Sequence, residues 1–214
     1  MNAISNPDVP ENRGAKCVVV TGGIACGKTV VTNFFKELGV PIFDTDIISR
    51  ELTAKGQPLL SLLAQRFGAE ILNTDGELNR RALRLKVFND EKALKDLNAL
   101  THPAIMSELK RRISGANAPY AIAVIPLFFE GRNQAVADRV LVIDVNEKTQ
   151  LQRLMDRDNM DEETARKMVA SQVPRALRRE KADDLIETDD GDLHEIKQAV
   201  IKLHKFYLSL FKKD

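Results

Sequence analysis

Residues 22–29 read Gly-Gly-Ile-Ala-Cys-Gly-Lys-Thr, and this stretch decides the fold. It fits the pattern G-x-x-x-x-G-K-[ST] at every required position. Glycines let successive backbone N–H groups turn inward around an anion, and the helix that follows adds its positive N-terminus. In this pattern Lys28 reaches the β and γ phosphates and the Thr29 hydroxyl binds Mg²⁺. The sequence therefore predicts a loop that binds nucleotide phosphates.

The sequence on either side of this loop predicts a buried strand before it and a helix after it. Residues 16–21 form a short β-branched run that leads directly into the first two glycines. From residue 28 to residue 38 the apolar side chains recur at helical spacing, and Gly39 follows where a helix would end. The order is strand, glycine loop, helix.

Four further apolar runs predict the rest of a sheet, and they lie at residues 40–43, 120–125, 139–145 and 184–186. Helical patterns separate these runs. Strands that alternate with helices are typical of an α/β protein with a mostly parallel, doubly wound sheet of about five strands.

Two segments do not fit a simple alternation of strands and helices. Residues 47–115 carry several helical patterns where one crossover helix would suffice, so we expect a helical insertion. Residues 148–181 hold six arginines and few large apolar side chains, so we expect a mobile helical lid. The sequence thus predicts a disordered tail over residues 1–15 and a single domain over residues 16–214 that includes both segments.

Composition and charge exclude several classes of protein. The 32 Lys and Arg residues nearly balance 31 Asp and Glu, whereas a general polyanion binder needs a surplus of cations. The longest apolar stretch, residues 120–129, is about half as long as the roughly 20 residues needed to span a bilayer. Residues 1–16 are polar and show no export signal. We therefore expect a cytoplasmic protein, a monomer or weak homo-oligomer, that binds neither nucleic acid nor membrane.

A pair of acidic residues follows the second predicted strand. Asp44 and Asp46 should lie near the bound phosphates, because the carboxyl ends of parallel strands face the ligand crevice. One carboxylate could join the Mg²⁺ shell while the other accepts the proton of an attacking hydroxyl. Alternatively, either residue could only cap the helix that we expect to start near Ile47.

Further motifs follow in a fixed order: Asp75-Gly76 with Arg80 and Leu83, Phe88, His102-Pro103, Pro126 to Glu130, Gln150, Arg153, Arg157-Asp158, Gln172 and Ala182-Asp183. On its own, His102-Pro103 could simply start a helix, and Glu130 is a weak signal. Together with the loop and the acid pair, however, the set resembles the dephospho-CoA kinase family over residues 16 to about 210.

The resemblance implies a P-loop NTPase fold, in which three α/β/α layers surround a five-stranded parallel sheet, with a helical CoA-side insertion and a helical lid. It implies transfer of the ATP γ-phosphoryl group to the ribose 3′-hydroxyl of 3′-dephospho-CoA, with Mg²⁺, as the last step of coenzyme A synthesis. Phosphoryl transfer depends mainly on positioning and charge neutralisation, and the loop, the acid pair and the arginine-rich segment would supply both.

The loop and the resemblance together assign roles to individual residues. Asp46, Lys28 and Arg157 would be catalytic, with Asp46 as the general base. Dephospho-CoA would contact Asp46, Arg80 and His102, and the metal would contact Thr29 and Asp44. The predicted ATP-binding residues are Gly22, Gly23, Ala25, Cys26, Gly27, Lys28, Thr29, Val30, Arg153 and Arg157.

The chain departs from the family pattern in four places. Ala25-Cys26 replaces the usual Gly-Ser, and Ala25 restricts φ where glycine would not. Asn79 stands for the usual Asp before Arg80, and Phe128 stands for the usual Leu. Thr188 replaces an Asn near the expected adenine site, so the contacts to the base are left open.

The two cysteines lead to opposite expectations. Cys17 and Cys26 lie too far apart along the strand and loop to form a disulfide. Cys26 sits beside a helix N-terminus and Lys28, whose positive potential favours a thiolate, so we expect it to be the reactive thiol. Cys17, in a buried strand, should be inert. The alternative is that Cys26 merely replaces a packed serine.

Two other functions fit the same loop. Another small-metabolite or nucleoside kinase would share the fold, since a fold alone does not name the acceptor. A non-catalytic nucleotide-binding regulator would need neither the acid pair nor the arginine-rich segment, and the Asn-Lys-x-Asp element of guanine-specific switches does not occur in the sequence.

Overall fold

A parallel sheet organises the residues that the computed structural model describes, which are 14–88, 90–131, 134–189 and 192–212. Its strands lie in the order β2-β3-β1-β4-β5, and every neighbouring pair is parallel. The strands are β1 (Lys16–Gly22), β2 (Ile42–Asp44), β3 (Tyr120–Val124), β4 (Arg139–Asp144) and β5 (Asp184–Glu187). Each of the five predicted apolar runs is therefore a strand, with ends shifted by one or two residues.

The register places the phosphate loop (residues 22–29) and the acid pair at the same edge of the sheet. Val20 of β1 pairs with Val124 of β3, and Val124 pairs in turn with Asp44, the last residue of β2. Only β3 therefore separates the start of the loop from the end of β2, which ends in Asp44, two residues before Asp46.

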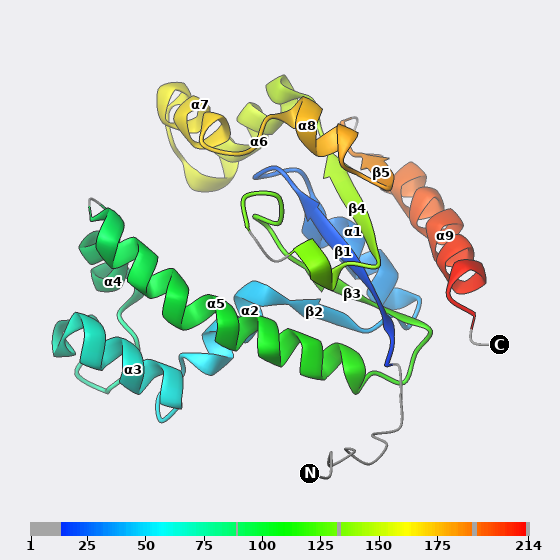
Figure 1. Cartoon of the computed structure of the whole chain (residues 1–214). Coiled ribbons are helices and arrows are strands. Elements are labelled where there is room, and N and C mark those ends of the chain that lie inside the picture. The colour runs from blue at the N-terminus through cyan, green and yellow to red at the C-terminus, as the bar shows by residue number, and fades with distance from the viewer. Residues whose placement is uncertain (1–13, 89, 132–133, 190–191, 213–214) are drawn as a thin grey trace, which may run out of the picture.

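Helices cover both faces of the sheet (Figure 1). On one face lie α1 (Lys28–Glu37) and α9 (Leu193–Leu210), and on the other lie α2 (Thr45–Leu52) and α5 (Glu91–Ser114). Side chains of β1 alternate between the faces: Val18 and Val20 join the first core, whereas Cys17 and Val19 join the second. The result is the predicted three-layer α/β/α arrangement.

The helical segment between β2 and β3 has a core of its own. After α2 it contains α3 (Pro58–Phe67), a short 3₁₀ turn (Ala69–Ile71), α4 (Arg80–Phe88) and the first half of α5. Figure 1 shows α3 and α4 set apart from the sheet. The buried residues of this separate core are Leu59, Leu63, Phe67, Ile71, Leu83, Val87 and Ala93.

Helix α5 runs unbroken for 24 residues and contains Pro103 in its interior. The alternative interpretation, that His102-Pro103 only starts a helix, therefore does not hold. A proline inside a helix lacks the N–H that would bond to the preceding turn, and the packing of α5 against α2, α3 and α4 outweighs this local loss.

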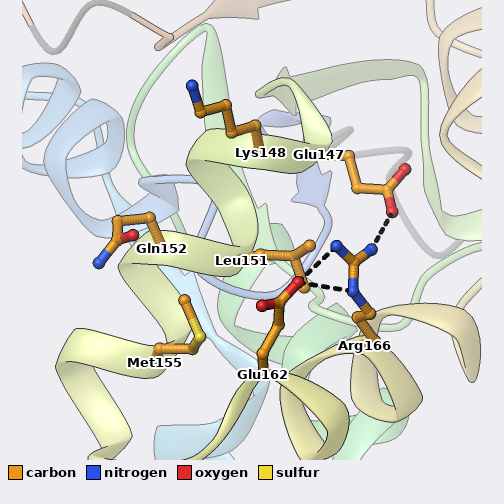
Figure 2. A pocket seen from close by; sticks show the side chains of 7 residues that line it. All are labelled: Glu147, Lys148, Leu151, Gln152, Met155, Glu162 and Arg166. Carbon is orange, nitrogen blue, oxygen red and sulfur yellow. Dashed lines mark hydrogen bonds and ion pairs between the residues drawn. The ribbon is translucent and has the colours of Figure 1, made fainter.

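The arginine-rich segment forms α6 (Glu147–Asp158), α7 (Glu162–Ala170) and α8 (Arg175–Glu180). Asn146 and Asp161 cap α6 and α7 by accepting hydrogen bonds from backbone N–H groups. A cavity of about 330 Å³ lies between α6 and α7, and Figure 2 shows side chains that line it. Arg166 of α7 borders this cavity and forms ion pairs with Glu147 and Glu162. Its charge is thus used to hold α7 against the start of α6.

The predicted tail, residues 1–15, lies outside the described residues except for Gly14 and Ala15. Ala15 is buried against the core that α2 and α5 cover. Within the described ranges, no helix has the length and apolar character needed to cross a membrane.

Candidate active site

The phosphate loop turns through three residues with positive φ. Gly22 has φ 150° and Gly27, which precedes α1, has φ 88°. A Cβ on Gly22 would collide with the Ile143 carbonyl, so only glycine fits there. Ala25 adopts φ 57°, the left-handed conformation that costs an L-residue about 1–2 kcal/mol. The predicted restriction at Ala25 is therefore accommodated as local strain.

Lys28, the first residue of α1, folds back over the loop. Its Nζ donates to the carbonyl oxygens of Gly22 at 3.0 Å and Gly23 at 2.9 Å. Thr29 is exposed beside it, and the backbone N–H of Val30 donates to the Gly27 carbonyl at 3.0 Å. The Lys28 ammonium group thus lies at the end of the loop that leaves β1.

Cys26 contradicts the prediction of a reactive thiol. Its side chain is only 1% exposed and packs in the core with Val18 and Val20. Burial raises the pKa of the Cys26 thiol, although Lys28, with its Nζ 3.6 Å from Sγ, acts in the opposite direction. The desolvation of a buried thiolate outweighs the positive potential of the loop. Both cysteines are free, and burial also raises the pKa of Cys17, to about 12.

Two glutamines from the arginine-rich segment (residues 148–181) hold the loop at Ile24. The Gln150 side chain of α6 donates to the Ile24 carbonyl at 2.8 Å, and the Gln172 side chain accepts from the Ile24 N–H at 2.9 Å. Between α7 and α8, the Val173 N–H donates to the Glu130 carboxylate at 2.9 Å. No role for these glutamines could be predicted from the sequence, because nothing local indicates which distant backbone group a polar side chain will meet.

Thr188, just after β5, supports the other side of the loop. It is 3% exposed, and its hydroxyl donates to the Cys26 carbonyl at 2.9 Å. Arg153 donates to the Thr188 hydroxyl at 3.1 Å and to its carbonyl at 2.6 Å. Arg153 thus reaches the loop only through Thr188, and its role in ATP binding stays a prediction. Thr188 also borders a cavity of about 460 Å³ between β5 and the start of α9.

The acid pair combines a capping role with an electrostatic one. Asp44 is the N-cap of α2, since its Oδ1 accepts from the Asp46 N–H at 2.7 Å, so the capping alternative holds for Asp44. Helix α2 starts at Thr45, two residues before the predicted Ile47. Desolvation and the nearby Asp44 carboxylate raise the pKa of Asp46, while Arg50 and Lys28 act to lower it. The interaction with Lys28 places Asp46 within the electrostatic reach of the loop.

The remaining predicted residues lie on the helical segment between β2 and β3 and on the arginine-rich segment. Arg80 begins α4 and donates to the Thr53 hydroxyl at 2.9 Å, and His102 is exposed on α5. Arg157, near the end of α6, is exposed and forms an ion pair with Asp158 at 2.7 Å. None of these three side chains has a hydrogen bond to the phosphate loop within the described ranges.

Known proteins share this arrangement along most of the chain. A model of the dephospho-CoA kinase family matches residues 16–195. The chain belongs to the dephospho-CoA kinase family. A dephospho-CoA kinase from Aggregatibacter actinomycetemcomitans is 45% identical over 194 residues, which cover 89% of this chain and 94% of that protein.

Solved structures are similar over the same length. A dephospho-CoA kinase from Campylobacter jejuni has a TM-score of 0.67 and 27% identity, and the match covers 88% of this chain and 95% of that one. A protein from Thermus thermophilus has a TM-score of 0.77 and 26% identity, with 90% and 98% covered. The sequence-based assignment to the dephospho-CoA kinase family and to its P-loop α/β fold is confirmed, and the roles of individual residues stay predictions.

Proposed function

We propose that this chain transfers the γ-phosphoryl group of ATP to the ribose 3′-hydroxyl of 3′-dephospho-CoA, yielding coenzyme A and ADP. One observation carries the proposal beyond the family assignment. The sheet register places the acid pair, with the raised pKa of Asp46, one strand away from the loop that holds Lys28. A proton acceptor beside a phosphate-binding loop is what transfer to a hydroxyl requires.

The residues at this edge fit Mg²⁺ held together with nucleotide phosphates. The Thr29 hydroxyl and the Asp44 carboxylate are oxygen ligands of the kind Mg²⁺ prefers, and Oδ1 of Asp44 also caps α2. The described residues contain no cluster of three or more metal-binding side chains, which suits an ion that takes its other ligands from phosphates and water. Bound Mg²⁺ would neutralise phosphate charge during transfer.

Asp46 would take the proton of the attacking 3′-hydroxyl. Burial and the neighbouring Asp44 raise the pKa of Asp46, which moves this carboxylate toward the pH at which it works best as a base. Lys28 would exchange its bonds to the Gly22 and Gly23 carbonyls for bonds to the phosphates, and would stabilise the charge that develops on the transferred group.

The acceptor would lie between the sheet edge and the helical insertion, which carries Arg80 and His102. Arg157 would exchange Asp158 for phosphate as the lid segment closes over the substrates. The apolar side chains of Ile186, Ile196 and Ala199 in the cavity beside Thr188 offer a surface for the adenine ring. A cytoplasmic location and a monomeric or weakly oligomeric state complete the proposal.

The decisive experiment measures ATP consumption with dephospho-CoA and with a panel of nucleosides and small alcohols. Turnover confined to dephospho-CoA, with the new phosphate on the 3′-oxygen by NMR, supports the proposal. Preferred turnover of another acceptor would indicate the alternative kinase. Nucleotide binding without phosphoryl transfer to any acceptor would indicate a regulator.

A further inference from the structure

The arginines of the lid segment differ in what they contact. Arg153 reaches Thr188, Arg157 pairs with Asp158, Arg166 pairs with Glu162, and both Arg175 and Arg179 pair with Asp144. The sixth, Arg178, forms no ion pair with any carboxylate in the part of the chain that the structure describes.

Arg178 is also the most deeply buried of the six. It is 6% exposed, and its Nη1 donates to the Val173 carbonyl. Its Nε is buried and has no hydrogen-bond partner among the described residues. A buried guanidinium group without an anion is costly, whereas Arg175 and Arg179, on the same helix, share the buried carboxylate of Asp144.

The guanidinium group of Arg178 lies against the phosphate loop. A Cβ placed on Gly23 would be 2.9 Å from Nη2 and 3.4 Å from Cζ of Arg178. Lys28 donates to the carbonyl of the same glycine at 2.9 Å. Two cations from distant parts of the chain thus lie beside Gly23. Lys28 donates to the loop carbonyls, whereas Arg178 donates to the Val173 carbonyl outside the loop.

The position of Lys28 indicates which phosphates of a bound nucleotide the Arg178 guanidinium group would contact. In loops of this pattern the lysine contacts the β and γ phosphates, while backbone N–H groups hold the α and β phosphates. Arg178 shares the Gly23 end of the loop with Lys28, so it lies at the end where the phosphoryl group is transferred. A guanidinium group there can donate two hydrogen bonds to one phosphate, which an ammonium group cannot reproduce.

We propose that Arg178 is a catalytic residue that binds the β and γ phosphates of ATP beside Lys28 and stabilises the γ-phosphoryl group during transfer. This inference rests on the proposed function. In the step, the bond from the γ-phosphorus to the β–γ bridging oxygen breaks, and a bond to the 3′-oxygen forms. ADP leaves with the electron pair and Asp46 takes the hydroxyl proton. Arg178 donates hydrogen bonds throughout and transfers no proton.

The test compares Arg178→Met with Arg175→Met, a control on the same helix. For Arg178→Met we expect a smaller drop in melting temperature than for Arg175→Met, because only the Val173 carbonyl loses a hydrogen bond and no carboxylate loses its partner. The stabilisation by Mg-ATP should shrink, whereas the stabilisation by AMP, which lacks both phosphates, should be unchanged. We expect kcat to fall by about 100-fold or more, with little change in KM for dephospho-CoA. Arg175→Met should show the reverse: a lower melting temperature with kcat and the Mg-ATP effect retained.

Arg178→Lys covers the case in which Arg178→Met does not fold. It keeps a buried cation, and its kcat should fall at least about tenfold because a point charge cannot replace the planar fork. Wild-type kcat and wild-type stabilisation by Mg-ATP in either folded variant would overturn the inference and leave Arg178 a structural residue. If the wild type is stabilised by Mg-ATP but does not phosphorylate dephospho-CoA, the proposed function fails. The contrast between Mg-ATP and AMP still decides the role of Arg178 in that case.

Discussion

Replacing Thr188 by valine should loosen the phosphate loop, because this side chain ties the loop to the end of β5. Valine keeps nearly the same shape but removes the hydroxyl that donates to the Cys26 carbonyl at 2.9 Å and accepts from Arg153 at 3.1 Å. At a site only 3% exposed, water does not readily replace these bonds. Leaving a buried polar group unpaired costs about 1–3 kcal/mol.

For a chain of this length, about 1 kcal/mol corresponds to roughly 2–4 °C in melting temperature. Thr188→Val should therefore melt about 2–12 °C below the wild type in a calorimetric scan. It should also bind Mg-ATP more weakly, because the Cys26 carbonyl is no longer fixed. Thr188→Ser is the matched control, since it keeps the hydroxyl and loses one methyl group. A serine variant that is less stable than the valine variant would show that packing, and not the hydroxyl, makes Thr188 important.

Four further substitutions test other parts of the site. Asp46→Asn should lower kcat by about 10²–10⁴-fold while Mg-ATP affinity changes little, and a loss of stability alone would show that Asp46 is structural. Cys26→Ser should keep activity, and mass mapping of the folded wild type should find both Cys26 and Cys17 slow to alkylate; rapid labelling of Cys26 would contradict its burial. Ala25→Gly should not reduce stability in thermal unfolding, since the left-handed φ of 57° removes the usual advantage of alanine, and a clear decrease would refute the strain. Burial acts to raise the pKa of Asp144, but its bonded arginines outweigh this and hold it below the ordinary value of 3.8, so Asp144→Asn should destabilise the protein at neutral pH. In urea titrations that deficit should shrink as the pH falls through the lowered pKa, and a deficit that does not depend on pH would contradict the assignment.

The sequence was sufficient where the determining signal is local. The glycine pattern at residues 22–29 predicts the turn of the backbone in this loop. The apolar runs predict the strands, because a parallel strand that is buried on both faces is marked by a continuous run of apolar residues. The register of β2 with β3 then brings Asp44 to the loop edge, as expected from the parallel order alone.

What the sequence did not predict depends on contacts between distant residues. Helix α5 continues through Pro103 because three other helices pack on it, which a local breaker signal does not reveal. The positive potential near Cys26 predicts a reactive thiol, but its side chain is buried in the core, as the alternative of a packed serine replacement implies. Arg178 and Arg175 are three residues apart in one arginine-rich pattern, and only the fold shows that one pairs with Asp144 while the other faces Gly23.

The separate core of the helical insertion divides the molecule into two packing units. The clusters around α3 and around the sheet share few side chains, and Leu52, at the end of α2, packs against both. Side chains in the α3 cluster can therefore be replaced without changing the packing of the sheet that shapes the phosphate loop. Selection could exchange the acceptor in this unit while the nucleotide unit stays the same. Small kinases of this design could then keep the nucleotide-binding sheet and loop while the helical insertion changes. Leu52 is the residue that packs against both parts.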